Sequence, residues 1–213
     1  MILTAELFNY KYKNTFQASK ALSKLAKKWN IIRVSKGIYL TKQYNQEELY
    51  TISNMLVQNS YISLETVLWN NWILTEITNK NYISAITTTN RPRTYSTSVG
   101  TFIFRYVQNW LFLVPNSLDI RYSTFNMATK EKALIDYLYF KVLSVSINKL
   151  RTEKDYILYL TELRLDLNNI NWQLYTYYTN HLIKVLAQKK WKYTLFRNSL
   201  VFLYKYKDQI SFY

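Results

Sequence analysis

The apolar residues of segment 16–30, "FQASKALSKLAKKWN", recur at the spacing of one face of an α-helix. They are Ala18, Ala21, Leu22, Leu25, Ala26 and Trp29. A shorter helix is predicted over residues 4–11, with Thr4 as its N-cap and Leu7 and Phe8 on its buried side. Two helices are therefore expected in succession.

The pattern changes to strands directly afterwards. "IIRVS" and "GIYLT" are rich in β-branched and aromatic residues and are separated by Lys36 and Gly37, which predicts a hairpin. Gly37 can adopt positive φ at the hairpin tip without steric cost. The order helix, helix, glycine-tipped ribbon is that of a winged helix-turn-helix, in which one helix enters the major groove. Residues 1–42 are therefore predicted to form a winged helix-turn-helix DNA-binding domain.

Residues 43–213 predict a larger mixed α/β domain with C-terminal helices, so the expected fold class of the whole chain is α+β. Helices are predicted over 45–60, 61–72 (capped by Ser60), 128–143, 154–165, 171–190 and 193–206. Strands are predicted over 82–89, 94–107 and 110–115, with a hairpin turn near Ser98, Val99 and Gly100.

The net charge of the chain indicates which class of partner it binds. The chain of 213 residues has a net charge of +15 and a pI near 9.7, which favours a polyanion such as nucleic acid. The expected DNA-binding residues are Lys20, Ser23, Lys24, Lys27, Lys28, Arg33 and Lys36. Two alternatives stay open: a lysine-rich helix face can be simply solvated, and an AT-rich genome would raise the lysine content.

Several classes are disfavoured by composition. The chain has no cysteine, which removes disulfides, thiolate metal sites and cysteine nucleophiles. Its longest apolar runs are shorter than the ~18 residues of a spanning helix, and the N-terminal residues do not resemble a signal peptide. We therefore expect a cytoplasmic protein without membrane contact.

An enzyme site is not expected, nor is a cofactor or a metal. His181 is the single histidine and lies within a predicted helix, where a structural role is favoured. Glu131 and Asp136 could form an acid–base or Mg²⁺ site, but the adjacent Lys130 and Lys132 favour a salt-bridged helix. The chain contains no P-loop, dinucleotide-binding or nucleophile-elbow motif.

A second basic region has two interpretations from the residues alone. Arg91, Arg93 and Arg105 flank the polar turn of "RPRTYSTSVGTFIFR". They form either a second basic patch or a solvated hairpin. Most of the 21 tyrosines follow strand-like or amphipathic patterns, which favours packing in the core over stacking on single-stranded bases.

Four stretches, in this order, resemble the AbiEi-type antitoxins, the transcriptional-regulator half of bacterial abortive-infection toxin–antitoxin systems. They are "IIRVSKGIYL", "SYISLETVLWNNWILTE", "TYSTSVGTFIFRYV" and "MATKEKALIDYLYF", and "ELRLDLNNINWQLYTYYTNHLIKVL" fits more loosely. The residues that match the family's motifs are Gly37 and Tyr39 at the wing, and Glu131, Lys132, Ala133, Leu134 and Asp136 on one helix. In that helix we expect Ala133 and Leu134 to pack, and the charged residues to pair or cap.

The resemblance implies a winged-helix N-terminal domain and a larger antitoxin domain. It also implies binding to inverted repeats in the operon's own promoter, and counteraction of a nucleotidyltransferase-like toxin in the type IV manner, without a required stable complex. Family members often have an extra helix before the helix-turn-helix, so we expect a short winged helix here.

Two alternative functions remain from the sequence. The large domain could neutralise a toxin by direct contact, as a protein-interaction module. Alternatively, the chain could be an RNA-binding regulator that protects the RNA target of the toxin through its tyrosines and the arginines of residues 91–105.

Overall fold

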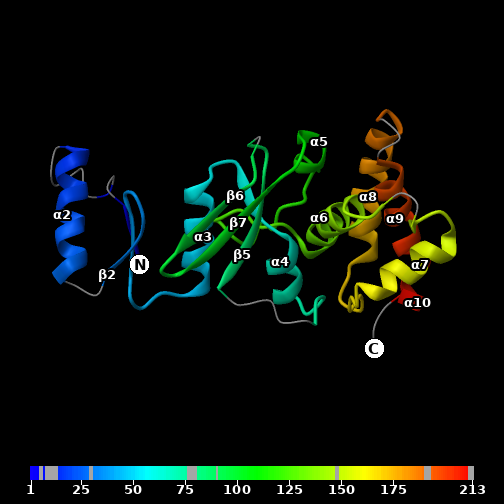
Figure 1. The fold of residues 1–213 in the computed structure, drawn as a ribbon, viewed down its shortest axis with the longest axis horizontal. Coiled ribbons are helices and arrows are strands. Elements are labelled where there is room, and N and C mark those ends of the chain that lie inside the picture. Colours follow the sequence, from blue (N-terminus) through cyan, green and yellow to red (C-terminus); the bar gives the residue numbers. More distant parts are fainter. Residues whose placement is uncertain are drawn as a thin grey trace.

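The chain folds into an α+β protein whose elements lie in a row along the long axis of the molecule (Figure 1). The computed structural model describes the chain except residues 5–6, 8–13, 29–30, 76–80, 90, 147–148, 190–192 and 211–213. Most of the helix predicted over residues 4–11 lies outside the described residues. Leu7, which is described, is 66% exposed, so its predicted burial is wrong.

The N-terminal part consists of a three-stranded antiparallel sheet and one described helix. Its elements are β1 (Ile2–Thr4), α2 (Thr15–Lys28), β2 (Ile31–Ser35) and β3 (Ile38–Thr41), with strand order β1-β3-β2. The predicted hairpin is confirmed, because β2 pairs with β3 across the turn at Lys36 and Gly37. Gly37 has φ +79°, the left-handed conformation that glycine adopts without strain.

The next helix, α3 (Gln46–Leu56), begins with a capping box. The side chain of Asn45 accepts from the Glu48 amide, and the Glu48 carboxylate accepts from the Asn45 amide. The buried residues of α3 belong to the same hydrophobic cluster as Val34 and Leu40 of the N-terminal sheet. The core is therefore continuous across the predicted domain boundary at residues 42 and 43.

A four-stranded mixed sheet forms the middle of the molecule. It consists of β4 (Ser60–Ile62), β5 (Tyr82–Thr87), β7 (Gly100–Tyr106) and β6 (Arg93–Thr97), in that spatial order. Only the pairing of β5 with β7 is parallel. The turn between β6 and β7 lies at Ser98 and Val99, as predicted.

Helices make up the C-terminal part (Figure 1). With the short helices that flank the sheet, they are α4 (Leu64–Asn70), α5 (Asn109–Phe112), α6 (Lys130–Leu143), α7 (Glu153–Glu162), α8 (Trp172–Ala187), α9 (Thr194–Lys205) and α10 (Lys207–Ile210). α6 is buried on nearly all sides, between α4 on one side and α8 and α9 on the other.

Two local predictions are wrong. The apolar run 110–115 begins inside the helix α5 and forms no strand, because a short apolar run has no periodicity that separates the two structures. Ser60 does not cap a helix, since it opens β4 and its hydroxyl donates to the Val57 carbonyl. The N-cap position of α4 is Ser63, whose hydroxyl is used elsewhere.

Candidate nucleic-acid interface

Helix α2 presents a stripe of exposed lysines. Asn14 fixes its start by accepting a hydrogen bond from the Phe16 amide at 2.8 Å. Ala18 and Leu22 are fully buried on the inner face. The exposed predicted DNA-binding residues of this helix are Lys20, Lys24, Lys27 and Lys28. Lys20, Lys24 and Lys27 are separated by four and three residues, and Lys28 follows Lys27 directly. Their ammonium groups therefore lie on the outer side of the helix.

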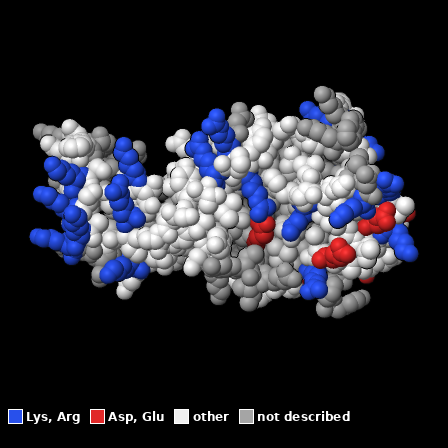
Figure 2. Space-filling view, viewed as in Figure 1, with Lys and Arg blue, Asp and Glu red and all other residues white. Residues whose placement is uncertain are grey.

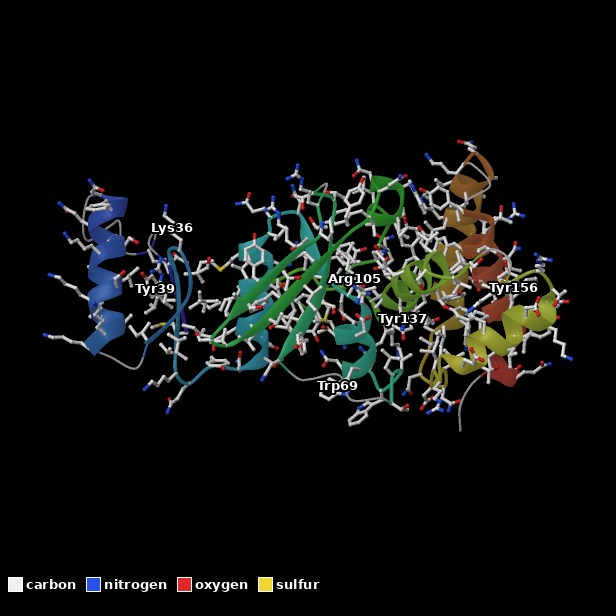
Figure 3. All side chains as sticks on the ribbon, in the orientation of Figure 1. Lys36, Tyr39, Trp69, Arg105, Tyr137 and Tyr156 are labelled. Carbon is white, nitrogen blue, oxygen red and sulfur yellow. The ribbon has the colours of Figure 1, made fainter. Side chains whose placement is uncertain are left out.

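The hairpin adds two more cations beside this helix. Arg33 and Lys36 are exposed, and Lys36 points away from the body of the protein at the hairpin tip (Figure 3). A groove of about 1010 Å³ runs between α2 and the hairpin. Its lining residues are Thr4, Phe16, Ser19, Lys20, Ser23, Arg33, Lys36, Gly37, Ile38, Met55 and Gln58. The groove thus carries positive charge on both of its walls.

Ser23 has a different position from the lysines. Its hydroxyl donates to the Ser19 carbonyl at 2.9 Å and lies 3.0 Å from the hydroxyl of Tyr39. Because a serine has one hydroxyl proton, the Tyr39 hydroxyl is the donor in the second bond. Tyr39 is fully buried and lies between the hairpin and α2 (Figure 3). Ser23 therefore fixes α2 on the hairpin.

Charge is distributed unevenly along the molecule. The sequence has no acidic residue between Leu7 and Gln46, whereas basic residues are frequent there. On the face shown in Figure 2, Lys and Arg gather over the N-terminal end, while Asp and Glu lie next to basic residues toward the other end. The described elements α2, β2 and β3 therefore carry positive charge and contain no carboxylate side chain of their own.

The three arginines of the predicted second patch are not gathered on one surface. Arg93 is opposite Phe104 in the β6–β7 ladder and shares its face of the sheet. Arg105 follows Phe104, so its side chain points to the other face. There its guanidinium donates to Glu65 at 2.9 Å and lies over the Phe140 ring at 5.4 Å. Arg91 and Arg93 are exposed, whereas Arg105 is half-buried and paired with Glu65.

Two charged residues of the segment that resembles the AbiEi motif, Lys132 and Asp136, belong to a buried network. Lys132 and Asp136 are fully buried one turn apart on α6 and form an ion pair. The Lys132 ammonium also donates to the Tyr61 hydroxyl at 2.6 Å. Asp136 accepts from Tyr61 at 3.0 Å and from Ser63 at 2.7 Å. Burial raises the pKa of Asp136 and lowers the pKa of Lys132, and the charge of each residue opposes the shift of the other.

This network of Tyr61, Ser63, Lys132 and Asp136, which we call the buried quartet, accounts for two of the three charged residues of the motif. The predicted pairing of charges and the packing of Ala133 and Leu134 are both confirmed. Glu131 is 2% exposed and accepts from the amide of Asn171, so it does not pair with Asp136. The two carboxylates have separate partners, and the geometry does not assemble them into the considered acid–base site.

Tyr61 and Ser63 were not predicted to be partners of α6. They lie more than seventy residues before Asp136 in the chain, one in the three-residue strand β4 and the other at the N-cap position of α4, and neither position gives an indication of that contact. Phe16 and Gln17 were also not singled out, although both are exposed in the first turn of α2.

Among the described residues, no cluster of three or more histidine and acidic side chains has the arrangement of a metal site. His181 is half-buried on α8. Within the same described part of the chain, none of the helices has both the length and the apolar character needed to span a membrane.

Comparison with known proteins identifies no relative: no protein-family model matches the chain, and no curated protein has a significantly similar sequence. The resemblance to AbiEi-type antitoxins therefore stays a prediction.

Proposed function

We propose that this protein binds double-stranded DNA through α2 and the β2–β3 hairpin, as the antitoxin and autorepressor of a toxin–antitoxin operon. The observation that carries the DNA-binding part is the exposed lysine stripe of α2, whose first member, Lys20, lines the same groove as Arg33 and Lys36. Lysine and arginine side chains contact the phosphates of DNA whatever its base sequence. The affinity that they give falls as the salt concentration rises.

The arrangement of the N-terminal elements supports a winged-helix mode of binding. A strand precedes α2, a glycine-tipped hairpin follows it, and the strand order is β1-β3-β2. In such a domain the helix before the hairpin enters the major groove, and the hairpin approaches the adjacent backbone. In this chain these elements carry the uncompensated positive charge.

The antitoxin part of the proposal rests on the family resemblance. Residues 43–213 would then counteract a nucleotidyltransferase-like toxin, and the N-terminal part would repress the operon. The RNA-binding alternative receives less support from the geometry, because Arg105 is held by Glu65 and does not join Arg91 and Arg93.

The test is a gel-shift titration of the purified full chain on its own upstream DNA, over a series of salt concentrations, with random duplex as competitor. We expect specific retardation that weakens as salt rises. The variant Lys24→Glu/Lys27→Glu should lose affinity for all duplexes, because it places carboxylates where phosphates pass.

The matched control is Lys154→Glu/Lys189→Glu, which makes the same change of charge at two exposed lysines of the C-terminal part. If both double variants bind equally well, α2 is not the interface. If the wild-type chain does not retard duplex DNA at low salt, the DNA-binding proposal is wrong.

A further inference from the structure

The first turn of α2 differs chemically from the rest of its exposed face. Phe16 is 72% exposed, and Gln17, next to it, is also exposed. Beyond this turn, the exposed side chains of the face are the four lysines. An aromatic ring and a carboxamide thus stand at the N-terminal end of a basic stripe.

Helical geometry places these two residues on either side of Lys20. Lys20 is four residues after Phe16 and three after Gln17, so it is a surface neighbour of both. The Lys20 ammonium lies 5.8 Å from the centre of the Phe16 ring. Phe16 also lines the groove that faces the hairpin. The two side chains therefore point toward the same ligand surface as the lysines.

The Phe16 ring and the Gln17 carboxamide differ from a lysine ammonium because they can distinguish one base from another. An ammonium on a flexible chain binds phosphate oxygens without reading sequence. A glutamine carboxamide matches the N6 and N7 pattern of adenine in the major groove, and a phenylalanine ring contacts the thymine methyl group. In helices that enter this groove, N-terminal residues contact the base edges.

We propose that Gln17 and Phe16 read an A·T base pair in the operator, while the lysines of α2 only position the helix on the backbone. This inference rests on the proposed DNA-binding function and adds a sequence preference to it. The Asn14 cap holds the first turn in place, because it fixes the Phe16 amide at the start of the helix.

The test is selection of bound sequences from a pool of randomised duplexes, carried out with the full chain and with Gln17→Ala, Gln17→Arg and Phe16→Ala. The wild-type consensus should contain an A·T pair that Gln17→Ala no longer selects. Gln17→Arg should replace it with G·C, because a guanidinium matches the guanine O6 and N7 atoms. The preference for consensus over random duplex should fall roughly tenfold in Gln17→Ala and Phe16→Ala, with the salt dependence unchanged.

Two exposed residues elsewhere give matched controls. Gln173 is the second residue of α8, and Ile120 is 97% exposed in a loop. Gln173→Ala and Ile120→Ala should retain the wild-type consensus. A wild-type consensus that survives in all Gln17 and Phe16 variants would overturn this inference and leave DNA binding intact. Failure of the wild-type chain to bind duplex DNA would overturn both.

Discussion

The hydroxyl of Tyr39 donates to the hydroxyl of Ser23, and this bond joins α2 to β3. Tyr39 is fully buried, whereas Ser23 is half-buried and lines the groove between α2 and the hairpin. The bond therefore holds α2 against the hairpin at the groove. Ser23, predicted as a DNA-binding residue, thus also has a positioning role.

Tyr39→Phe should weaken DNA binding a few-fold without changing its salt dependence. The variant removes one hydroxyl and no charge, so the same number of phosphates is neutralised. Its free energy of unfolding should fall by about 1 kcal/mol, the net value of one hydrogen bond. Fluorescence anisotropy over a salt series and urea unfolding measure the two effects. Tyr177→Phe, at a half-exposed tyrosine of α8, is the control.

Removal of Asp136 should strongly destabilise the protein. Asp136→Ala leaves the Lys132 ammonium in a fully buried position without its counter-charge, which costs about 3–5 kcal/mol. Urea unfolding followed by circular dichroism gives this value. Asp208→Ala, at an exposed aspartate of α10, should change stability by less than about 0.5 kcal/mol.

Replacement of the whole buried quartet should be milder than the single change. Tyr61→Phe, Ser63→Ala, Lys132→Met and Asp136→Leu together remove every polar group of the network, so none is left without a partner. We expect the quadruple variant to be more stable than Asp136→Ala in the same urea titration. A quadruple variant less stable than Asp136→Ala would contradict this prediction, and its difference from the wild type gives the net contribution of the network.

Deletion of residues 1–42 should lower the stability of the remaining chain. The deletion removes Val34 and Leu40, which are buried in one cluster with Leu49 of α3. The fragment 43–213 should therefore unfold at a lower temperature than the full chain and bind more of a hydrophobic dye. An equal melting temperature for fragment and full chain would show that the two parts are independent.

Substitution of Gly100 should be more harmful than substitution of Gly37. A Cβ atom on Gly100 would lie 2.7 Å from the carbonyl oxygen of Asn81, and its φ of +155° disfavours other residues. Gly100→Ala should cost about 1–3 kcal/mol because the backbone has to shift. Gly37→Asn should be tolerated, since asparagine enters the left-handed region more readily than most residues. Thermal unfolding compares the two.

The sequence correctly predicted those elements that have a long periodic pattern or a residue type characteristic of a particular turn. Segment 16–30 has a full helical repeat, and the Lys36–Gly37 turn has a glycine where the backbone is left-handed. The run 110–115 was misassigned because it is too short to show a period. Contacts between distant segments were not predictable from one sequence. Nothing in "SYI" indicates that Tyr61 contacts α6, or in "FRYV" that Arg105 turns toward Glu65.

The buried quartet also bears on the order in which the chain can assemble. Tyr61 and Ser63 lie 71 to 75 residues before the α6 groups that bind them. During synthesis from the N-terminus, Tyr61 and Ser63 therefore emerge with their hydroxyls bonded to water. These hydroxyls can form their hydrogen bonds with Lys132 and Asp136 only after α6 has been synthesised. Closure of so long a loop is slow and entropically costly. We infer that docking of α6 onto the middle sheet is a late step in folding, made after the N-terminal part has been synthesised.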